Sequence, residues 1–551
     1  MPKILNPILP GFNADPSILR VGDDYYIANS TFEWYPGVQI HHSTDLAKWT
    51  LINRPLSRAS QLDMRGNPDS CGIWAPCLTH DGEKFYLVYT DVKRKDGSFK
   101  DAHNYIVTAT DIRGEWSDPV YANSSGFDPS LFHDPDTGKK WFVNMLWDHR
   151  RRGGLLKNSM FEGIVLQEFD AAQGKLVGPK KNIYPGTELA LVEGPHLYKR
   201  NGWYYLLTAE GGTSYEHACT LARSKDIWGP YETHPQKHVL TSKDAPDAAI
   251  QKAGHGDLVE TKDGRTYLVH LCGRPITKAR RCVLGRETSI QECYWGDDEW
   301  LYVKDGPVPS LWVDVPGTRD EEPYWKESRY TFENGKLPSD FQWLRTPEPD
   351  RIFKVGAGEG GKQLVLRGRE TIGSWFEQAL VARRQTHFSY DAETVLDFNP
   401  EDERQFAGLT AYYCRYNFFY LTVTADENGE RELLLMISDV SWPDGYLDAQ
   451  ALLEPVKISK EGKVKLALTV RGAELQFFYA LEGKEDELKK IGPVLDASIL
   501  SDECGGHQTH GSFTGAFVGV ACSDLNGTAK EASFDHFVYR PVRDKSDRYE
   551  V

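Results

Sequence analysis

The stretch from Pro10 to Leu19, P-G-F-N-A-D-P-S-I-L, constrains the fold more than any other part of the chain, because variants of it recur four more times. The later copies read A-P-C-L from Ala75, D-P-S-L from Asp128, G-P-H-L from Gly194 and, more loosely, H-G-D-L from His255. Each copy leads into a turn and a second apolar, aromatic run, which is the pattern of a β-hairpin. The chain therefore repeats one hairpin motif five times.

The spacing of roughly 60 residues suits a four-stranded propeller blade that carries loops. A second echo supports this interpretation, because similar acid-containing turns precede Trp49, Trp116 and Trp228 in three of the units. We therefore predict a five-bladed β-propeller. A β-sandwich made of similar hairpins would not place the same motif at the same position of five successive units.

A second domain is expected after the repeats. From Asp305 to Pro323 the chain is rich in Pro, Gly and acidic residues, which indicates an irregular linker. Beyond it, short alternating apolar runs follow one another at intervals of roughly 10 to 20 residues, as in an antiparallel β-sandwich. We predict an all-β protein with a propeller and trailing linker over residues 1–324 and a β-sandwich over residues 325–551.

Charge and cysteine usage restrict the partners and the location. The formal net charge of −16 disfavours nucleic acid. No apolar run is long enough to span a membrane, and the N-terminus lacks the apolar segment of a signal peptide, so we expect a cytoplasmic protein with no membrane partner. The nine cysteines include no C-x-x-C pair and are interpreted as reduced thiols. The basic run at 149–152 is interpreted as a solvated loop.

Acidic residues recur at the phase of the repeat that should face the propeller axis. The innermost strand of each blade lines the central channel, so Asp15 and Asp128, with Glu193 one residue earlier in its blade, should converge there beside His255. One Asp-Pro pair alone commonly caps a turn, but three acids in one phase are harder to explain structurally. Paired carboxyl groups around a pocket are the equipment of glycosidic bond hydrolysis, with Glu193 suited to be the general acid and Asp15 the ionised base.

Several motifs together resemble the β-xylosidases of glycoside hydrolase family 43. They are the opening motif, G-I-W-A-P at 72–76, F-D-P-S-L-F at 127–132, E-G-P-H-L-Y at 193–198 and L-G-R-E-T at 284–288. The resemblance covers nearly the whole chain and implies a five-bladed propeller and an inverting mechanism. Carried over by motif, it makes Asp15 the general base, Glu193 the general acid, and Asp128 the residue that orients Glu193 and raises its pKa.

The resemblance also implies contacts to the sugar. His255 and Arg286 match positions that contact the terminal sugar, although His255 could equally be a core histidine or a calcium ligand acting through water. Phe32, Trp74 and Trp147 match aromatic pocket walls, but propeller blades bury many such rings without any ligand. Phe513, from the second domain, is expected to close one end of the pocket and to restrict cleavage to chain ends. No cofactor is expected to be required, and a structural or activating calcium ion is left open.

These observations predict an exo-acting, inverting β-1,4-xylosidase that releases xylose from the non-reducing ends of xylobiose and short xylo-oligosaccharides. An α-L-arabinofuranosidase side activity is expected, because an arabinofuranoside presents a similar array of hydroxyl groups. The alternatives are a dedicated α-L-arabinofuranosidase and a non-catalytic sugar-binding propeller. The resemblance further suggests a homo-oligomer, either a dimer or a tetramer.

Overall fold

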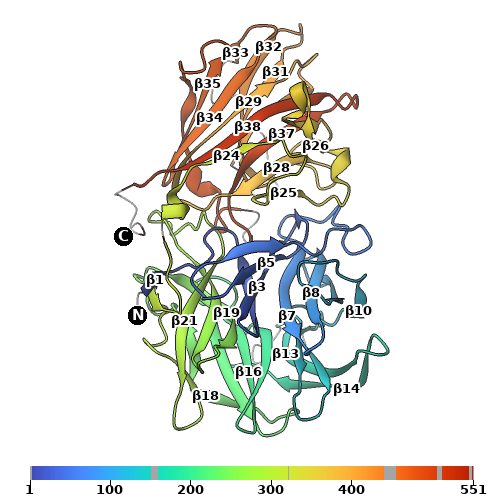
Figure 1. The fold of residues 1–551 in the computed structure, drawn as a ribbon, viewed down its shortest axis with the longest axis vertical. Helices are drawn as coiled ribbons and strands as arrows, with labels where there is room; N and C mark the ends of the chain where they lie inside the picture. The colour runs from blue at the N-terminus through green and yellow to red at the C-terminus, as the bar shows by residue number, and fades with distance from the viewer. Residues whose placement is uncertain are drawn as a thin grey trace.

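The computed structural model describes residues 3–150, 159–320, 322–439, 455–505, 512–544 and 549. The described chain forms two β-rich bodies stacked along the long axis of the molecule (Figure 1). The basic run interpreted as a solvated loop lies outside the described residues from Arg151 onwards. Within the described ranges, no helix has the length and apolar character needed to cross a membrane.

The first body consists of five four-stranded antiparallel sheets. The first sheet contains β2 (Ala14–Val21), β3 (Asp24–Ser30), β5 (Gln39–Ser43) and β6 (Thr50–Asn53). The second contains β7 (Gly72–His80), β8 (Phe85–Arg94), β9 (Asp101–Ala109) and β10 (Val120–Asn123). The third contains β11 (Ser130–His133), β12 (Lys140–Trp147), β13 (Phe161–Asp170) and β14 (Lys175–Tyr184). The fourth contains β15 (Glu193–Arg200), β16 (Trp203–Glu210), β17 (Ala218–Ser224) and β18 (Glu232–Thr241). The fifth contains β19 (Gln251–Glu260), β20 (Thr266–Gly273), β21 (Glu287–Trp295) and β22 (Leu301–Val303).

The innermost strands close into a ring. Strand β2 contacts β7, β7 contacts β11, β11 contacts β15, β15 contacts β19, and β19 returns to β2. A short sheet of β1 (Lys3–Leu5) and β23 (Trp312–Asp314) lies beside this closure. The predicted five-bladed propeller is therefore confirmed. Neighbouring blades pack face to face, which explains why strands such as β20 are buried along their whole length and carry nearly continuous apolar runs.

Asp257, on the innermost strand of the fifth blade, joins three blades. Its Oδ2 atom accepts hydrogen bonds from the Ser17 hydroxyl and the Ile18 amide, both at 2.9 Å. Its Oδ1 atom accepts one from the Tyr198 hydroxyl at 2.5 Å. The carboxylate is only 5% exposed, so these donors take the place of water. Asp257 thus fastens the first blade to the fourth and fifth.

The second body is a β-sandwich of two eight-stranded sheets. One sheet has the order β26 (Phe353–Ala357), β27 (Gln363–Arg367), β38 (Glu531–Pro541), β29 (Ser389–Asp397), β34 (Val464–Arg471), β35 (Glu474–Leu481) and β36 (Lys489–Asp496), with β24 (Ser328–Thr331) paired to β38. The other has the order β33 (Val456–Lys457), β32 (Arg431–Ser438), β31 (Asn417–Ala425), β30 (Gln405–Cys414), β37 (Phe517–Asp524), β28 (Ala379–Arg384), β25 (Phe341–Leu344) and β4 (Trp34–Tyr35). The short 3-10 helices are η1 (Glu322–Trp325), η2 (Pro349–Arg351), η3 (Glu359–Gly361) and η4 (Ala497–Ile499). The all-β class and the predicted sandwich are confirmed.

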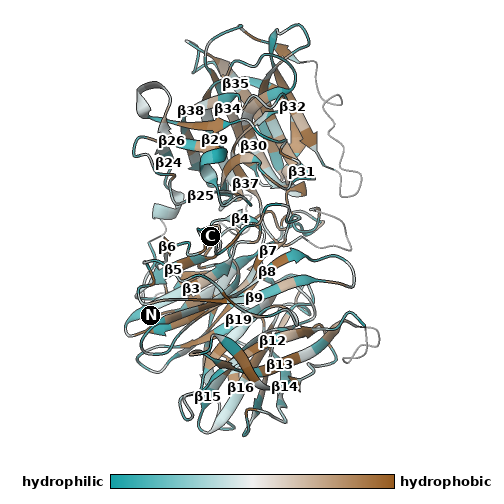
Figure 2. Ribbon diagram, turned by 90° about the vertical axis from the view of Figure 1, so that its right-hand side faces the viewer, coloured by the Kyte–Doolittle hydropathy of each residue, from teal (hydrophilic) through white to brown (hydrophobic). Residues whose placement is uncertain are grey.

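The two bodies share a sheet and a core. Strand β4 belongs to the propeller segment of the chain, yet it pairs with β25 at the edge of a sandwich sheet, where the bodies meet (Figure 2). Trp34 stacks on Phe517 with ring centroids 3.6 Å apart. The buried Arg345 guanidinium donates to the Asp69 carboxylate at 2.7 Å. These contacts hold the sandwich in a defined position over the propeller.

We predict that Asp257→Asn destabilises the protein by about 2–4 kcal/mol, because the amide nitrogen cannot accept the hydrogen bonds that the lost carboxylate oxygen accepted. Urea unfolding followed by tryptophan fluorescence measures this change. Asp263→Asn, in an exposed turn of the same blade, is the control and should have little effect. Equal stability of the two variants would contradict the role of Asp257 in closing the ring.

Candidate active site

A cavity of about 410 Å³ opens at the propeller axis beneath the second domain. All nine site residues predicted from the sequence line it: Asp15, Phe32, Trp74, Asp128, Trp147, Glu193, His255, Arg286 and Phe513. They come from all five blades and from the sandwich. The cavity is thus the place where the repeated motif and the second domain meet.

The repeated motif brings its residues together through one backbone conformation. Asp15 (φ 50°), Ala75 (φ 37°), Asp128 (φ 53°), Gly194 (φ 57°) and His255 (φ 43°) all lie in the left-handed region, which residues other than glycine seldom adopt. In four of the blades the pairing of the innermost strand shifts register at this position, as in a β-bulge. Such an irregularity redirects a side chain away from the ladder, which explains how these residues reach the cavity.

Asp15 is held by a hydroxyl group and faces a histidine. The Ser30 hydroxyl donates to Asp15 Oδ2 at 2.6 Å and accepts a hydrogen bond from the Ala75 amide at 2.7 Å. His255 Nδ1 lies 3.6 Å from Asp15 Oδ1. Burial lowers the pKa of His255 to about 4, although the Asp15 charge opposes this shift. The imidazole is therefore neutral near pH 7, and Asp15 faces a polar neighbour rather than a cation.

Gly194 occupies the axis position of the fourth blade because His255 leaves no room for a side chain. A Cβ atom there would lie 3.0 Å from His255 Nε2, and the φ of 57° would strain any other residue. The acidic side chain of this blade consequently comes from Glu193, one residue earlier. This explains the offset of Glu193 in the repeat.

Glu193 and Asp128 both hold protons more tightly than ordinary carboxyl groups. Burial and the charge of Asp15 raise the pKa of Glu193 to about 7. Burial and the charges of Glu193 and Asp15 raise the pKa of Asp128 well above its ordinary value. Burial and the Asp15 charge are the main causes of the raised pKa of Glu193. The contribution of Asp128 to that pKa, which the resemblance implies, stays a prediction.

Asp128 is placed to orient the strand that carries Glu193. Its Oδ2 atom accepts a hydrogen bond from the Gly194 amide at 3.1 Å. Because Gly194 directly follows Glu193, this bond fixes the start of β15. The contact acts through the backbone next to Glu193.

The second domain also supports the cavity from behind, through a residue that does not line it. The Arg286 guanidinium lies 4.5 Å from the centre of the Phe513 ring, and its Nε atom donates to Asp502 Oδ2 at 3.4 Å. Asp502 also accepts a hydrogen bond from the Tyr413 hydroxyl at 2.6 Å. Burial raises the pKa of Asp502 to about 6, while Lys252 and Arg286 oppose the shift. Asp502 lies in no motif, so nothing in the sequence connected it with Arg286.

Aromatic rings form one wall of the cavity. The Phe32 ring lies 6.0 Å from Trp74 and 6.2 Å from Phe513, measured between ring centroids. The Trp74 indole donates to the Ser70 carbonyl at 3.0 Å. Phe32 is only 2% exposed and Trp74 8%, so both rings are core residues as well as lining residues. Each of these two rings therefore serves both as a core residue of the propeller and as part of the pocket wall.

Two lysines that the sequence analysis did not single out, Lys95 and Lys100, also line the cavity. Lys100 Nζ lies 4.4 Å from the centre of the Trp147 ring and donates to the Lys95 carbonyl at 2.6 Å. Burial and the charge of Lys95 lower the pKa of Lys100 to about 8. The two residues lie outside the repeated motif, and only the folded chain brings them to the axis.

The sequence left a structural or activating calcium ion open, and the question stays open here. Within the described ranges, no three His, Cys, Asp or Glu residues are grouped so that they could hold a metal ion. The two carboxyl groups with raised pKa values would also have to lose their protons before they could bind a cation well.

Comparison with known proteins agrees with this geometry. Residues 4–301 match the family model described as Glycosyl hydrolases family 43, and residues 329–540 match the model described as Beta xylosidase C-terminal Concanavalin A-like domain. The chain belongs to family 43 of the glycosyl hydrolases. The chain is therefore a glycoside hydrolase, which disfavours the alternative of a non-catalytic sugar-binding propeller.

Individual relatives of this family 43 chain match it over nearly its full length. It is 76% identical over 551 residues to the Xylosidase/arabinosidase 43B of Humicola insolens, with 100% of both chains covered. It is 48% identical to the Beta-xylosidase of Bacillus subtilis, covering 98% of this chain and 99% of the relative. The crystal structure of xylan beta-1,4-xylosidase from Bacillus Halodurans C-125 matches with a TM-score of 0.91 at 49% identity, covering 98% of this chain and 100% of that one.

We predict that Asp502→Asn lowers kcat/KM of this family 43 hydrolase for an aryl glycoside roughly tenfold, because Arg286 loses the carboxylate that lies 3.4 Å from its Nε atom. The loss should appear mainly in KM, since Asp502 positions Arg286 and does not itself line the cavity. Asp391→Asn is the matched control, because Asp391 pairs with Arg471 away from the cavity. Unchanged kinetics of the Asp502 variant, or an equal loss in the control, would contradict this role.

Proposed function

We propose that the protein is an exo-acting β-1,4-xylosidase that releases xylose from the non-reducing ends of xylobiose and short xylo-oligosaccharides with inversion at the anomeric carbon. The observation that carries the proposal is the convergence of Asp15, Asp128 and Glu193 on one cavity beneath Phe513. The relatives named as xylosidases, matched over the full chain, support the choice of sugar.

Each acid has a distinct role in the proposed reaction. Glu193 keeps its proton up to about pH 7 because it is buried beside the Asp15 charge, so it can protonate the departing glycosidic oxygen. Asp15, oriented by Ser30, accepts a proton from water while the water oxygen attacks the anomeric carbon. The bond from that carbon to the leaving oxygen breaks as the new bond forms, and exchange with solvent then removes the proton from Asp15 and returns one to Glu193. Asp128 keeps Glu193 in position through the Gly194 amide.

Phe513 and Arg286 support an exo mode of action. Phe513 comes from the sandwich and its amide donates to Ser70 Oγ of the propeller at 3.1 Å, which fixes the ring over the cavity. Arg286 stacks against that ring from the propeller side. A pocket covered in this way suits the terminal sugar of a chain better than an internal one. Hydrogen-bond donors such as Arg286 then orient the hydroxyl groups of that sugar.

An α-L-arabinofuranosidase side activity is part of the proposal, because an arabinofuranoside can offer similar hydroxyl groups to the same acids. The relative from Humicola insolens carries both activities in its name, which supports this assignment. Comparing kcat/KM for an aryl xyloside and an aryl arabinofuranoside separates it from the alternative of a dedicated arabinofuranosidase.

We also propose a reducing, cytoplasmic location. All nine cysteines are free thiols, and all except the half-buried Cys504 are buried. Thiols in this state are typical of proteins that fold in a reducing compartment. Xylo-oligosaccharides taken up by the cell would be the partners in this setting. Assembly into a homo-oligomer stays a prediction.

We predict that Glu193→Gln lowers kcat for xylobiose by about 10²- to 10⁴-fold, because the amide cannot protonate the leaving oxygen. The loss should be milder for an aryl xyloside whose leaving group needs little protonation. In the unsubstituted enzyme, activity should fall as the pH rises through about 7, when Glu193 loses its proton. The variant should lack this basic limb of the pH profile. Full turnover of xylobiose by the variant would rule out Glu193 as the general acid.

We predict that the first sugar released from a β-xyloside is α-xylose, because water attacks the face opposite the leaving group when one carboxyl group acts as base and the other as acid. Proton NMR recorded within the first minutes of hydrolysis distinguishes the anomers before mutarotation. An initial β-anomer signal would show retention and overturn the assignment of Asp15 as a base.

A further inference from the structure

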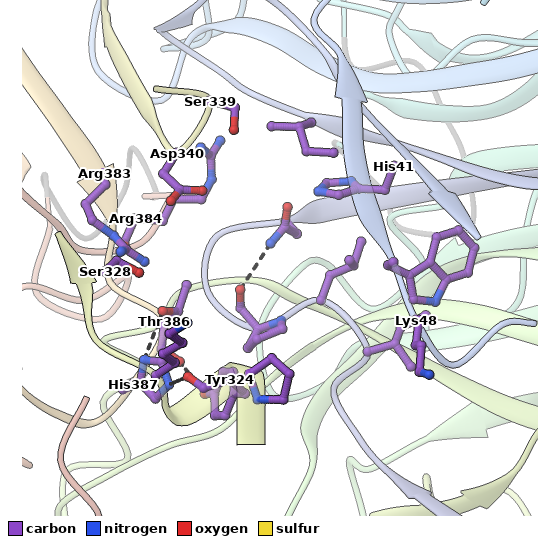
Figure 3. Close-up of a pocket in the computed structure, with 18 of the residues that line it drawn as sticks. His41, Lys48, Tyr324, Ser328, Ser339, Asp340, Arg383, Arg384, Thr386 and His387 are labelled. Carbon is purple, nitrogen blue, oxygen red and sulfur yellow. Dashed lines mark hydrogen bonds between the residues drawn. The ribbon is translucent and has the colours of Figure 1, made fainter. Parts of the chain in front are cut away.

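A second cavity, of about 700 Å³, lies between the propeller and the sandwich (Figure 3). The propeller contributes residues around β5 and β6, the segment between the domains contributes residues 319, 320, 323, 324 and 326, and the sandwich contributes the end of β28 with residues that follow it. Two carboxylates, Asp320 and Asp340, line the cavity. Six basic side chains line it as well: Lys48, Arg54, Arg319, Lys326, Arg383 and Arg384. The protein carries a net charge of −16, so this local excess of cations is unusual for the chain.

Three of the arginines hydrogen-bond to neutral groups. Arg384 donates to the Gln342 side chain at 2.5 Å and to the Phe12 carbonyl at 2.6 Å. Arg383 donates to the Tyr330 hydroxyl at 2.8 Å, and Arg54 to the Gln39 side chain at 2.6 Å. Within the described part of the chain, none of the three guanidinium groups has a carboxylate oxygen within 4 Å. Arg383 and Arg384 are nonetheless more than 90% buried.

Two polar atoms at this cavity have no hydrogen-bond partner among the described residues. They are Arg384 Nη2 and His41 Nδ1, both buried. A buried donor without a partner is destabilising, and more so when it is charged, so native proteins seldom leave one unmatched. The arginines also destabilise one another. Burial and the neighbouring Arg54 lower the pKa of Arg384 well below its ordinary value, and only the Asp340 charge opposes this.

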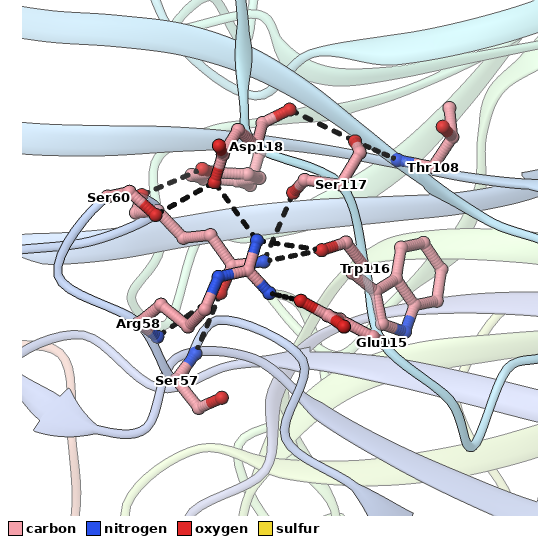
Figure 4. A network of polar contacts seen from close by, with 10 residues as sticks. Ser57, Arg58, Ser60, Thr108, Glu115, Trp116, Ser117 and Asp118 are labelled. Atoms are coloured by element: carbon pink, nitrogen blue, oxygen red, sulfur yellow. Dashed lines mark hydrogen bonds and ion pairs between the residues drawn. The ribbon is translucent and has the colours of Figure 1, made fainter.

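Arg58, only four residues after Arg54, shows how this chain neutralises an arginine elsewhere (Figure 4). Its guanidinium lies 2.9 Å from Glu115 and 3.0 Å from Asp118, and it also donates to the Trp116 carbonyl at 3.0 Å. Its side chain is 35% exposed, so it needs these partners less than the buried arginines do. Arg54, Arg383 and Arg384 thus lack the counter-charge that the more exposed Arg58 receives.

We propose that the interdomain cavity binds a polyatomic oxyanion, either free as phosphate or sulfate or carried on a sugar as a phosphate or carboxylate group. Guanidinium groups present paired N–H donors that match the oxygen atoms of such anions. Arg54 donates from the propeller, and Arg383 and Arg384 donate from the sandwich. A bound anion would supply the missing charge and bridge the two domains.

The cavity is also connected with the segment that leads to the active site. Arg384 donates to the Phe12 carbonyl, and the Gln39 side chain donates to Asn13 Oδ1 at 3.1 Å. The Asn13 amide in turn donates to the Arg286 carbonyl at 2.8 Å. An anion held by Arg54 and Arg384 would therefore stabilise the domain contact and the residues just before Asp15.

The test is a titration of the full chain with sodium phosphate, sodium sulfate and sodium glucuronate at constant ionic strength, with sodium chloride as the reference. Isothermal titration calorimetry and the thermal unfolding temperature are the two measurements. We expect phosphate or sulfate to bind saturably at one site and to raise Tm. Tighter binding of glucuronate than of both inorganic anions would assign the site to a sugar carboxylate instead of a free oxyanion.

Arg54→Gln should weaken the binding roughly tenfold, because one charged donor is lost. Lys48→Gln, at the exposed mouth of the cavity, should weaken it less, and neither change removes a fully buried side chain. Arg58→Gln is the matched control and should bind as the unsubstituted protein does. Three outcomes would overturn the proposal: a Tm shift no larger than that in chloride, unchanged binding by Arg54→Gln, or competition between the anion and xylose.

Discussion

The left-handed residue in or just before the innermost strand of each blade is the constraint on which the rest of the site depends. Such a conformation costs on the order of 1–3 kcal/mol for a residue other than glycine, and four of the five positions carry one, including Asp15 and His255. The closed ring of blades, fastened by Asp257, holds these residues in place. The irregular backbone turns the side chains of these residues away from the regular pairing of the strands and towards the cavity at the axis.

Crowding at that point sets the chemistry of the acids. Asp15, Asp128 and Glu193 line one cavity and are buried, so ionising all three carboxyl groups together is unfavourable. Burial and the neighbouring carboxylates raise the pKa values of Asp128 and Glu193, whereas Asp15 accepts a hydrogen bond from the Ser30 hydroxyl. His255 stays neutral because it is buried. In the proposed mechanism, differences in burial and hydrogen bonding divide these three similar carboxyl groups into an acid, a base and a positioning residue.

The sandwich is part of the site and not an appendage to it. It contributes Phe513 to the cavity and Asp502 behind Arg286, and it is held in position by the shared strand β4 and the buried Arg345. The same apposition of domains creates the second cavity, where arginines from both bodies face one another. Since one interface forms both cavities, a ligand in the second would act on the surface that completes the first.

The sequence by itself determined the propeller, the sandwich and the convergence of Asp15, Asp128, Glu193 and His255, because a repeated motif fixes which residues share a phase, and the closed ring converts that shared phase into a shared place. The other five residues that line the active-site cavity were expected from the resemblance to family 43 and not from the repeat. Only the tertiary structure revealed Asp502, Lys100, the pairing of β4 with β25, and the unneutralised Arg384. These features depend on contacts between segments far apart in the chain, where neither residue lies in a repeat. Burial likewise decided the charge states, because a carboxyl or guanidinium group titrates according to the water and charges around it, which no local pattern records.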